Sequence, residues 1–169
     1  MYLCRMKNTF FILLSLFLLT SCSNADDDLQ KIDQKMHIYV ENATGLDYLN
    51  SELADGYASV KMTDLGGDYN SQAINNFSVK KDSLDRFFIE YSAGAARNFL
   101  SESGDTKIYV SDIDISFYKK NITTADFIDH YRIYYENKPS VFQIQKVEVN
   151  EKVVFTKQEG EPNIIKIVK

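Results

Sequence analysis

The sequence predicts an all-β fold, specifically an antiparallel β-sandwich of immunoglobulin-like type with about eight or nine strands. Short β-prone runs recur along the chain at intervals of about 8–14 residues. Several of these runs alternate apolar and polar residues, which is the period of a strand with one buried face. The chain also contains 11 Tyr and 11 Phe, only two Pro and no Trp. Because Tyr and Phe favour half-buried pleated surfaces, composition and pattern agree.

The first half of the predicted domain consists of strands separated by turn-forming residues. A β-prone run at 37–41 precedes residues 42–45, where Asn, Thr and Gly favour a turn. Residues 57–63 alternate and place their apolar side chains on one face. Residues 86–91 are a clear strand, and residues 98–100 pair back on their neighbours after a small-residue turn.

The second half repeats the same pattern with longer runs. Strands are expected at 107–110 and 112–118, with Ile113, Ile115 and Phe117 inward. Residues 126–135 fit both periods, and the pattern favours a strand from His130 with a short helix before it. The runs 141–149 and 152–156 flank Asn150-Glu151, which predicts a tight hairpin. A last strand is expected at 164–168.

The N-terminus has the order of features found in secretory leaders. Arg5 and Lys7 precede an apolar run of ten residues, 10–19, which Thr20-Ser21-Cys22 follows. A membrane-spanning helix needs about 20 apolar residues, whereas a leader needs about 7–15. The alternatives are an ordinary cleaved leader and a buried core strand.

Leu19-Thr20-Ser21-Cys22 resembles the lipobox of bacterial lipoproteins. The resemblance implies cleavage before Cys22 and acylation of its thiol, so that membrane lipid is the first partner. Two or more acyl chains hold a protein firmly, at about 0.8 kcal/mol per buried methylene. The expected organisation is a signal peptide at 1–21, a lipidated cysteine with an acidic tether at 22–35, and a β-sandwich domain at 36–169.

The acidic residues 26–28 after the cysteine are similar to the export signal of Bacteroidota surface lipoproteins. This resemblance implies an outer-membrane protein displayed at the cell surface, with the periplasmic face and a simple solvated tether as alternatives. Residues 42–50 and 149–152 also resemble a group of small Bacteroidota lipoproteins. That group has a Pro-Gly element and an Asn-Gly hairpin where this chain has 51–56 and Asn150-Glu151. Because the group has no assigned activity, it supplies no catalytic residues.

Length and charge limit the classes of function. Without residues 1–21 the chain keeps 148 residues, enough for one domain with a proper core. The leader holds two of the 19 basic residues and none of the 24 acidic ones, so the remainder has a net charge of 17 − 24 = −7. Such a charge repels phosphate backbones, and no basic cluster offsets it. We therefore expect no nucleic-acid partner.

The search for catalytic chemistry finds one candidate metal site. The only imidazoles are His37 and His130, and neither sits in a nucleophile or zinc motif. Asp112 and Asp114 are two residues apart, so on a strand their carboxylates share one face and could contribute half of a Ca²⁺ site. The alternative is an exposed polar strand face. No cofactor is expected.

Two further sites concern sugars. Asp82-Ser83-Leu84 resembles the acceptor motif for protein O-glycosylation in Bacteroidota, with Ser83 as the modified residue. Tyr131, Tyr134 and Tyr135 are candidates for stacking on pyranose rings, although Tyr134 and Tyr135 should point to opposite faces of a strand. The alternative is that these tyrosines belong to the core.

The sequence thus predicts a non-catalytic binding or accessory module anchored to the outer membrane, whose partner is a glycan or another envelope protein. The rival hypotheses are a hydrolase that uses carboxylates and a structural subunit of a surface assembly joined by edge-strand addition.

Overall fold

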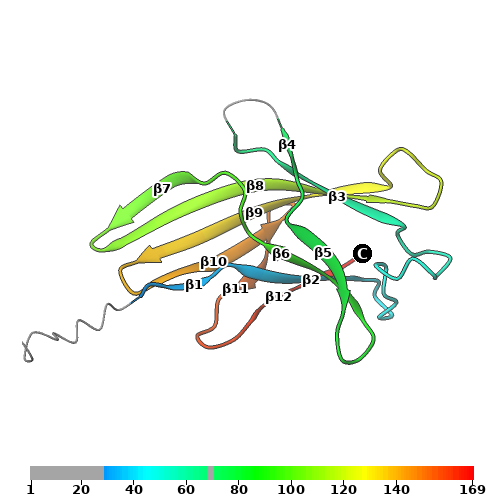
Figure 1. The fold of residues 1–169 in the computed structure, drawn as a ribbon, viewed down its shortest axis with the longest axis horizontal. Helices are drawn as coiled ribbons and strands as arrows, with labels where there is room; N and C mark the ends of the chain where they lie inside the picture. The colour runs from blue at the N-terminus through cyan, green and yellow to red at the C-terminus, as the bar shows by residue number, and fades with distance from the viewer. Residues whose placement is uncertain (1–28, 68–70) are drawn as a thin grey trace, which may run out of the picture.

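The computed structural model describes residues 29–67 and 71–169. The described residues form twelve strands and no helix, which confirms the all-β prediction (Figure 1). None of them therefore forms a helix long and apolar enough to cross a membrane. The strands are β1 (Lys31–Asp33), β2 (Lys35–Glu41), β3 (Ser59–Asp64), β4 (Gln72–Ile74), β5 (Phe77–Lys81), β6 (Phe87–Ser92), β7 (Asn98–Ser103), β8 (Thr106–Tyr118), β9 (Phe127–Lys138), β10 (Val141–Val149), β11 (Lys152–Thr156) and β12 (Asn163–Val168).

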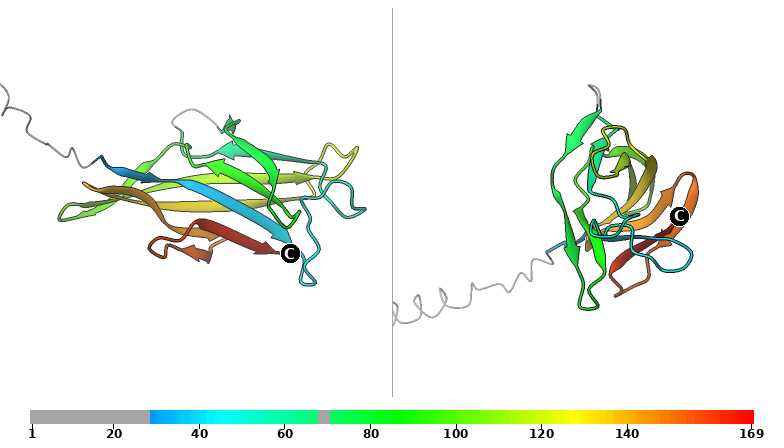
Figure 2. Two further views of the ribbon diagram at one scale, coloured as in Figure 1. Left: turned by 60° about the horizontal axis from the view of Figure 1, so that its bottom comes forward. Right: turned by 90° about the vertical axis from the view of Figure 1, so that its right-hand side faces the viewer.

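Two sheets enclose the core. The larger has eight strands in the order β1-β10-β9-β8-β3-β4, with β11 also paired to β10 and β7 also paired to β8. The smaller has the order β12-β2-β6-β5. Figure 2 shows the larger sheet curving around the smaller one. Long antiparallel hairpins from β8 to β11 make up most of the larger sheet, and their strong twist produces the curvature.

Several finer expectations need correction. The sheets are mixed rather than wholly antiparallel, because β1 pairs in parallel with β10 and β12 with β2. The strand order is not clearly immunoglobulin-like, and twelve strands replace the expected eight or nine. The predicted tether to residue 35 is also too long, because Lys31–Asp33 already forms β1. The leader, Cys22 and the acidic run lie outside the described residues.

The ambiguous region before His130 is entirely strand. β9 begins at Phe127, and no helix precedes it in the described chain. Its inward side chains alternate from Phe127 to Tyr135 without interruption, so the strand period applies to the whole segment. β8 is likewise one strand of 13 residues where two shorter strands were expected.

The core confirms the predicted alternation in β8. Ile113, Ile115 and Phe117 are completely buried. The ring of Phe117 lies 5.2 Å from those of Tyr57 and Phe127, and Tyr57 and Phe127 meet edge to face. Aromatic pairs at such separations stabilise a core beyond the area they bury. They close the end of the molecule at which β8 turns into β9.

The predicted hairpin between β10 and β11 is also confirmed. Asn150 and Glu151 have φ values of 49° and 67°, the left-handed geometry that a two-residue hairpin turn requires. The Asn150 side chain supports the turn, because its Oδ1 accepts a hydrogen bond from the His130 amide at 3.0 Å. Asn tolerates positive φ better than most residues, which explains its use here.

Buried tyrosines predict a defined response to alkali. Burial raises the pKa of Tyr135 to about 12, and burial together with the charge of Asp129 raises the pKa of Tyr131. A pKa above the unfolded value of about 10 means that the fold favours the protonated hydroxyl. The contribution of the protonated tyrosines to the free energy of unfolding is complete below about pH 10 and should be lost as the pH rises toward 12.

The measurement is ultraviolet absorbance of tyrosinate, recorded with circular dichroism during an alkaline titration. The absence of Trp leaves the signal to the tyrosines. Exposed tyrosines should ionise near pH 10, and the buried ones only as β structure is lost. Ionisation of all tyrosines near pH 10 with an unchanged dichroism spectrum would contradict the prediction.

Candidate functional site

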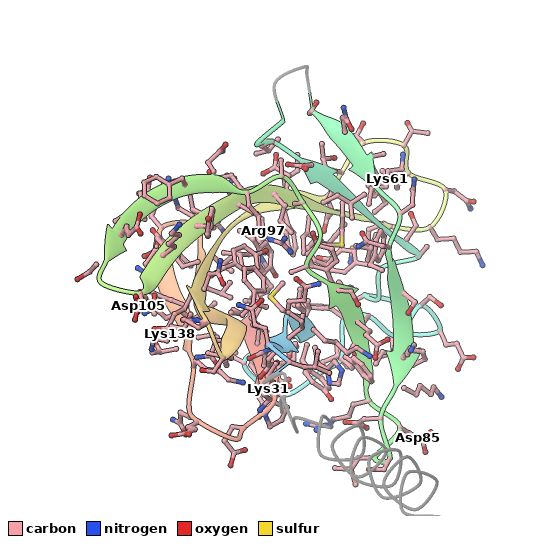
Figure 3. The ribbon with its side chains drawn as sticks, turned by 60° about the vertical axis from the view of Figure 1, so that its left-hand side comes forward. Lys31, Lys61, Asp85, Arg97, Asp105 and Lys138 are labelled. Atoms are coloured by element: carbon pink, nitrogen blue, oxygen red, sulfur yellow. The ribbon has the colours of Figure 1, made fainter. Side chains whose placement is uncertain are left out.

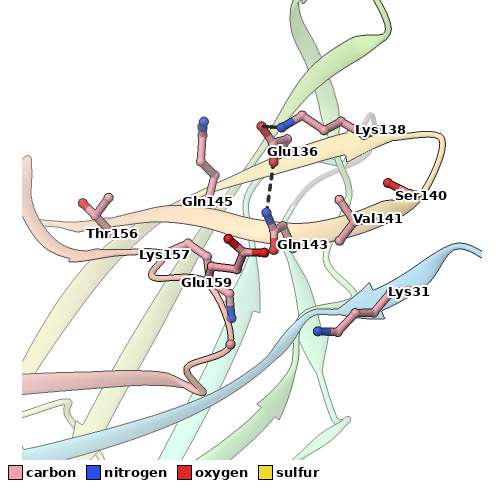
Figure 4. Close-up of a pocket in the computed structure, with 11 residues that line it drawn as sticks. Lys31, Glu136, Lys138, Ser140, Val141, Gln143, Gln145, Thr156, Lys157 and Glu159 are labelled. Atoms are coloured by element: carbon pink, nitrogen blue, oxygen red, sulfur yellow. Dashed lines mark hydrogen bonds and ion pairs between the residues drawn. The ribbon is translucent and has the colours of Figure 1, made fainter.

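A concavity of the described surface lies on the outer face of β9 and β10. It is a polar groove of about 690 Å³, bounded by β1 on one side and by the loop from β11 to β12 on the other (Figure 4). Its lining is almost entirely polar. The residues are Lys31, Lys138 and Lys157, Glu136 and Glu159, Gln143 and Gln145, Ser140 and Thr156, with Val141 and Gly160.

Glu136 is held in place in the wall of this groove. Its Oε1 accepts from Lys138 Nζ at 2.8 Å, and its Oε2 accepts from Gln143 Nε2 at 3.0 Å. Burial opposes ionisation, but these two hydrogen bonds outweigh it and lower the pKa of Glu136. An ionised carboxylate with both oxygens bonded can orient a ligand or accept a hydrogen bond from it. It is poorly suited to donating a proton as a general acid.

The loop side of the groove rests on a buried polar network around Lys157. This side chain is only 7% exposed. Its Nζ donates to Asp33 Oδ2 at 2.6 Å, to the Glu161 carbonyl at 2.6 Å and to Asn163 Oδ1 at 3.0 Å. Asn163 in turn donates to Asp33 Oδ1 at 2.8 Å and to the Lys35 carbonyl at 2.9 Å. The network connects β1, the loop and β12, and thereby fixes the distance between the two sides of the groove.

A bulge in β10 shapes the remaining wall. The pairing register of β10 with β9 shifts between Ile144 and Lys146, so Gln145 has no direct partner on β9. The Gln145 carbonyl instead accepts from the Lys157 amide at 2.8 Å, and its side chain lines the groove. β-bulges often re-aim a side chain in this way.

The aspartate pair that could contribute half of a Ca²⁺ site lies against two basic side chains of β9. Asp112 and Asp114 do share the outer face of β8, opposite Arg132 and His130 of β9. His130 Nδ1 lies 3.1 Å from Asp114 Oδ1, and its Nε2 lies 3.4 Å from Asp112 Oδ1. Arg132 Nε lies 3.6 Å from the same Asp112 oxygen. Within the described ranges, no three His, Cys, Asp or Glu side chains are grouped as metal ligands.

The tyrosine prediction is wrong for two of its three residues. Tyr131 and Tyr135 are completely buried in the core and cannot present a face to a sugar. Tyr134 lies on the outer face, as the strand period requires, but Lys146 Nζ lies 3.9 Å from its ring centre. Its hydroxyl donates to Glu148 at 3.0 Å. Its ring is therefore covered by Lys146 on one side.

Ser83 is exposed in the turn between β5 and β6. Asp82 Oδ1 accepts from the amides of Leu84 at 2.8 Å and Arg86 at 3.0 Å, and these hydrogen bonds stabilise the turn. Ser83 is accessible, and its modification remains a prediction.

Sequence reasoning missed the groove. The alternation of Gln143 and Gln145 marks a polar face on one predicted strand, which is the only local signal. The opposite sides come from Lys31 and from residues 157–160, and no pattern in the sequence connects these segments.

No protein-family model matches this chain, and neither the curated proteins nor the solved structures contain a match.

Proposed function

We propose that this chain is a non-catalytic binding module, lipid-anchored to the outer membrane through Cys22, that holds a polar ligand in the groove on β9 and β10. The surface of the cell is the expected location and the periplasmic face the alternative. The anchor rests on the leader and lipobox pattern of residues 1–22. Incorporation of labelled palmitate into the wild type, and its loss in Cys22→Ala, tests the anchor.

The binding role is inferred from the residues that line the groove. Amides, hydroxyls, carboxylates and ammonium groups surround it, and Val141 is its one large apolar side chain. These groups can form hydrogen bonds with the alternating donors and acceptors of a glycan, whereas an apolar ligand would leave them without partners. Glu136 is already bonded on both oxygens, which favours binding over acid catalysis.

The test is a glycan array followed by titration of the strongest glycan, with and without Ca²⁺. Gln145→Ala removes a groove amide, and we expect it to weaken binding about tenfold or more, which corresponds to about 1.4 kcal/mol. Gln72→Ala is the matched control, because Gln72 is exposed on β4 at the far edge of the same sheet. Equal affinity of the two variants, or no glycan bound at all, would reject the proposal.

A structural subunit of a surface assembly is the second candidate, and β7 favours it. All six residues of β7 are exposed, and it pairs only with β8 among the described strands. Its side chains include no Lys or Pro, the residues that usually protect an edge from pairing. The bulge after Phe99 opposes this role by distorting the edge.

A further inference from the structure

Toward the end of the molecule where the described chain begins, exposed apolar side chains lie on both edges of the larger sheet, on β7 at one edge and on β1 and the residues before it at the other. Leu29 is 87% exposed, Ile32 57%, Phe99 58% and Leu100 50%. We call these four residues the entry rim. Single exposed apolar residues are ordinary, but four at one end of a domain call for a partner. The remaining exposed apolar residues are distributed over other strands and turns.

The entry rim lies where the larger sheet extends past the smaller one. Figure 1 shows β7 and the adjoining parts of β8, β9 and β10 reaching beyond the smaller sheet, and β1 enters beside them. Phe99 is in register with Tyr109, and their rings meet edge to face at 6.0 Å. Ile32 is in register with Phe142 across β1 and β10. Phe99 therefore continues the apolar inner face. Ile32 continues it beside Phe142, over whose ring the Arg97 guanidinium lies at 4.9 Å.

The position of the anchor indicates what covers this rim. Cys22 precedes Leu29 by seven residues, which span at most about 25 Å when extended. A tether of this length confines the domain near the bilayer at a high effective concentration, so even a weak apolar contact is populated. The entry end is the end that such a tether presents to the membrane.

The charges at this end suit a lipid surface. Figure 3 shows Asp105 and Lys138 at the tips of neighbouring hairpins, with Lys31 on the adjoining strand. Lys107 and Lys138 are paired with Glu102 at 3.8 Å and Glu136 at 2.8 Å. Arg97 on the inner face donates to Gln34 Oε1 and to the Ala93 carbonyl, each at 2.7 Å. Lysine and arginine stems can lie on hydrocarbon with their charged groups among the headgroups, so these charges are compatible with apolar insertion.

We propose that the entry rim inserts into the interfacial region of the bilayer that holds the anchor, so that the domain lies against the membrane with this end down. This inference rests on the proposed lipid anchor. It fixes the orientation of the polar groove, whose Lys31 and Lys138 lie at the same end. A ligand would then be held close to the membrane surface.

The absence of Trp from the chain allows a direct test with single-Trp reporters in the full-length lipidated protein. Phe99→Trp places the reporter on the rim, and Leu84→Trp is the control, because Leu84 is 72% exposed in the β5–β6 turn away from the entry end. Each variant is reconstituted into phosphatidylcholine vesicles with and without brominated acyl chains. We expect brominated lipid to quench Trp at 99 several-fold more strongly than Trp at 84, with little dependence on salt. Leu100→Trp serves as the second rim reporter if Phe99→Trp does not fold.

Flotation of the same samples separates the two proposals. Protein that floats with the vesicles but shows equal quenching at 99 and 84 has an anchor and overturns the inserted rim. If the protein does not float, or if its Cys22→Ala variant floats as well as the unchanged protein does, both the lipid anchor and the inserted rim are overturned. Protection of Trp at 99 from aqueous iodide without quenching by brominated lipid would assign the rim to a second copy or another protein, and would also overturn the inference.

Discussion

Replacing Lys169 with methionine is expected to lower the free energy of unfolding by about 3–5 kcal/mol, because it leaves a buried carboxylate without its cation. Asp129 is 1% exposed and faces inward from β9. Its Oδ1 accepts from Lys169 Nζ and from Asn150 Nδ2 at 2.9 Å, whereas its Oδ2 has no hydrogen-bond partner among the described residues. The Lys169 ammonium also lies 3.8 Å from the centre of the Phe127 ring.

Urea unfolding followed by circular dichroism measures this loss. Lys166→Met is the matched control, because Lys166 is exposed on β12 and should change stability by no more than about 0.5 kcal/mol. Adding Asp129→Asn to Lys169→Met should restore part of the loss, since the buried group is then neutral. Equal stability of the two lysine variants would show that the ion pair contributes nothing.

The part of the fold that could be predicted from sequence is the part encoded locally. The alternation of Ile113, Ile115 and Phe117 with polar residues correctly predicts which face of β8 is buried. Asn150-Glu151 correctly predicts a two-residue turn, because the geometry of that turn depends on its own two residues. The same alternation places Tyr134 and Tyr135 on opposite faces, as observed.

The parts that could not be predicted depend on pairing between distant segments. β1 has three residues with a single apolar side chain, and it becomes a strand only because β10 supplies a partner more than 100 residues later. In β9 both faces of the strand carry tyrosine, so the sequence period alone could not say which of them is covered, and Tyr131 and Tyr135 looked as available as Tyr134. The groove is the extreme case, because its two sides and its base come from three separate segments.

Replacing Lys157 with methionine is the second substitution expected to have a large effect, a loss of about 2–4 kcal/mol in the free energy of unfolding. The side chain is 7% exposed and uses all three of its donors, whereas Asp33 keeps 24% exposure and so partial solvation. That residual hydration of the carboxylate makes the expected loss smaller than for Lys169. Lys152→Met, on the exposed side of β11, is the control and should change stability little.

The same substitution should also loosen β1 before the rest of the domain unfolds. β1 is held by three paired residues of β10 and by the Asp33 interactions with Lys157 and Asn163, so removing Lys157 takes away much of its attachment. Amide hydrogen exchange should therefore accelerate in residues 31–33 more than in β8, whose pairing with β9 extends over eleven residue pairs. Because β1 forms one side of the groove, ligand affinity should fall together with this protection. Unchanged exchange in β1 alongside a large loss of global stability would show that Lys157 supports only the core, and that the groove does not depend on the network beneath it.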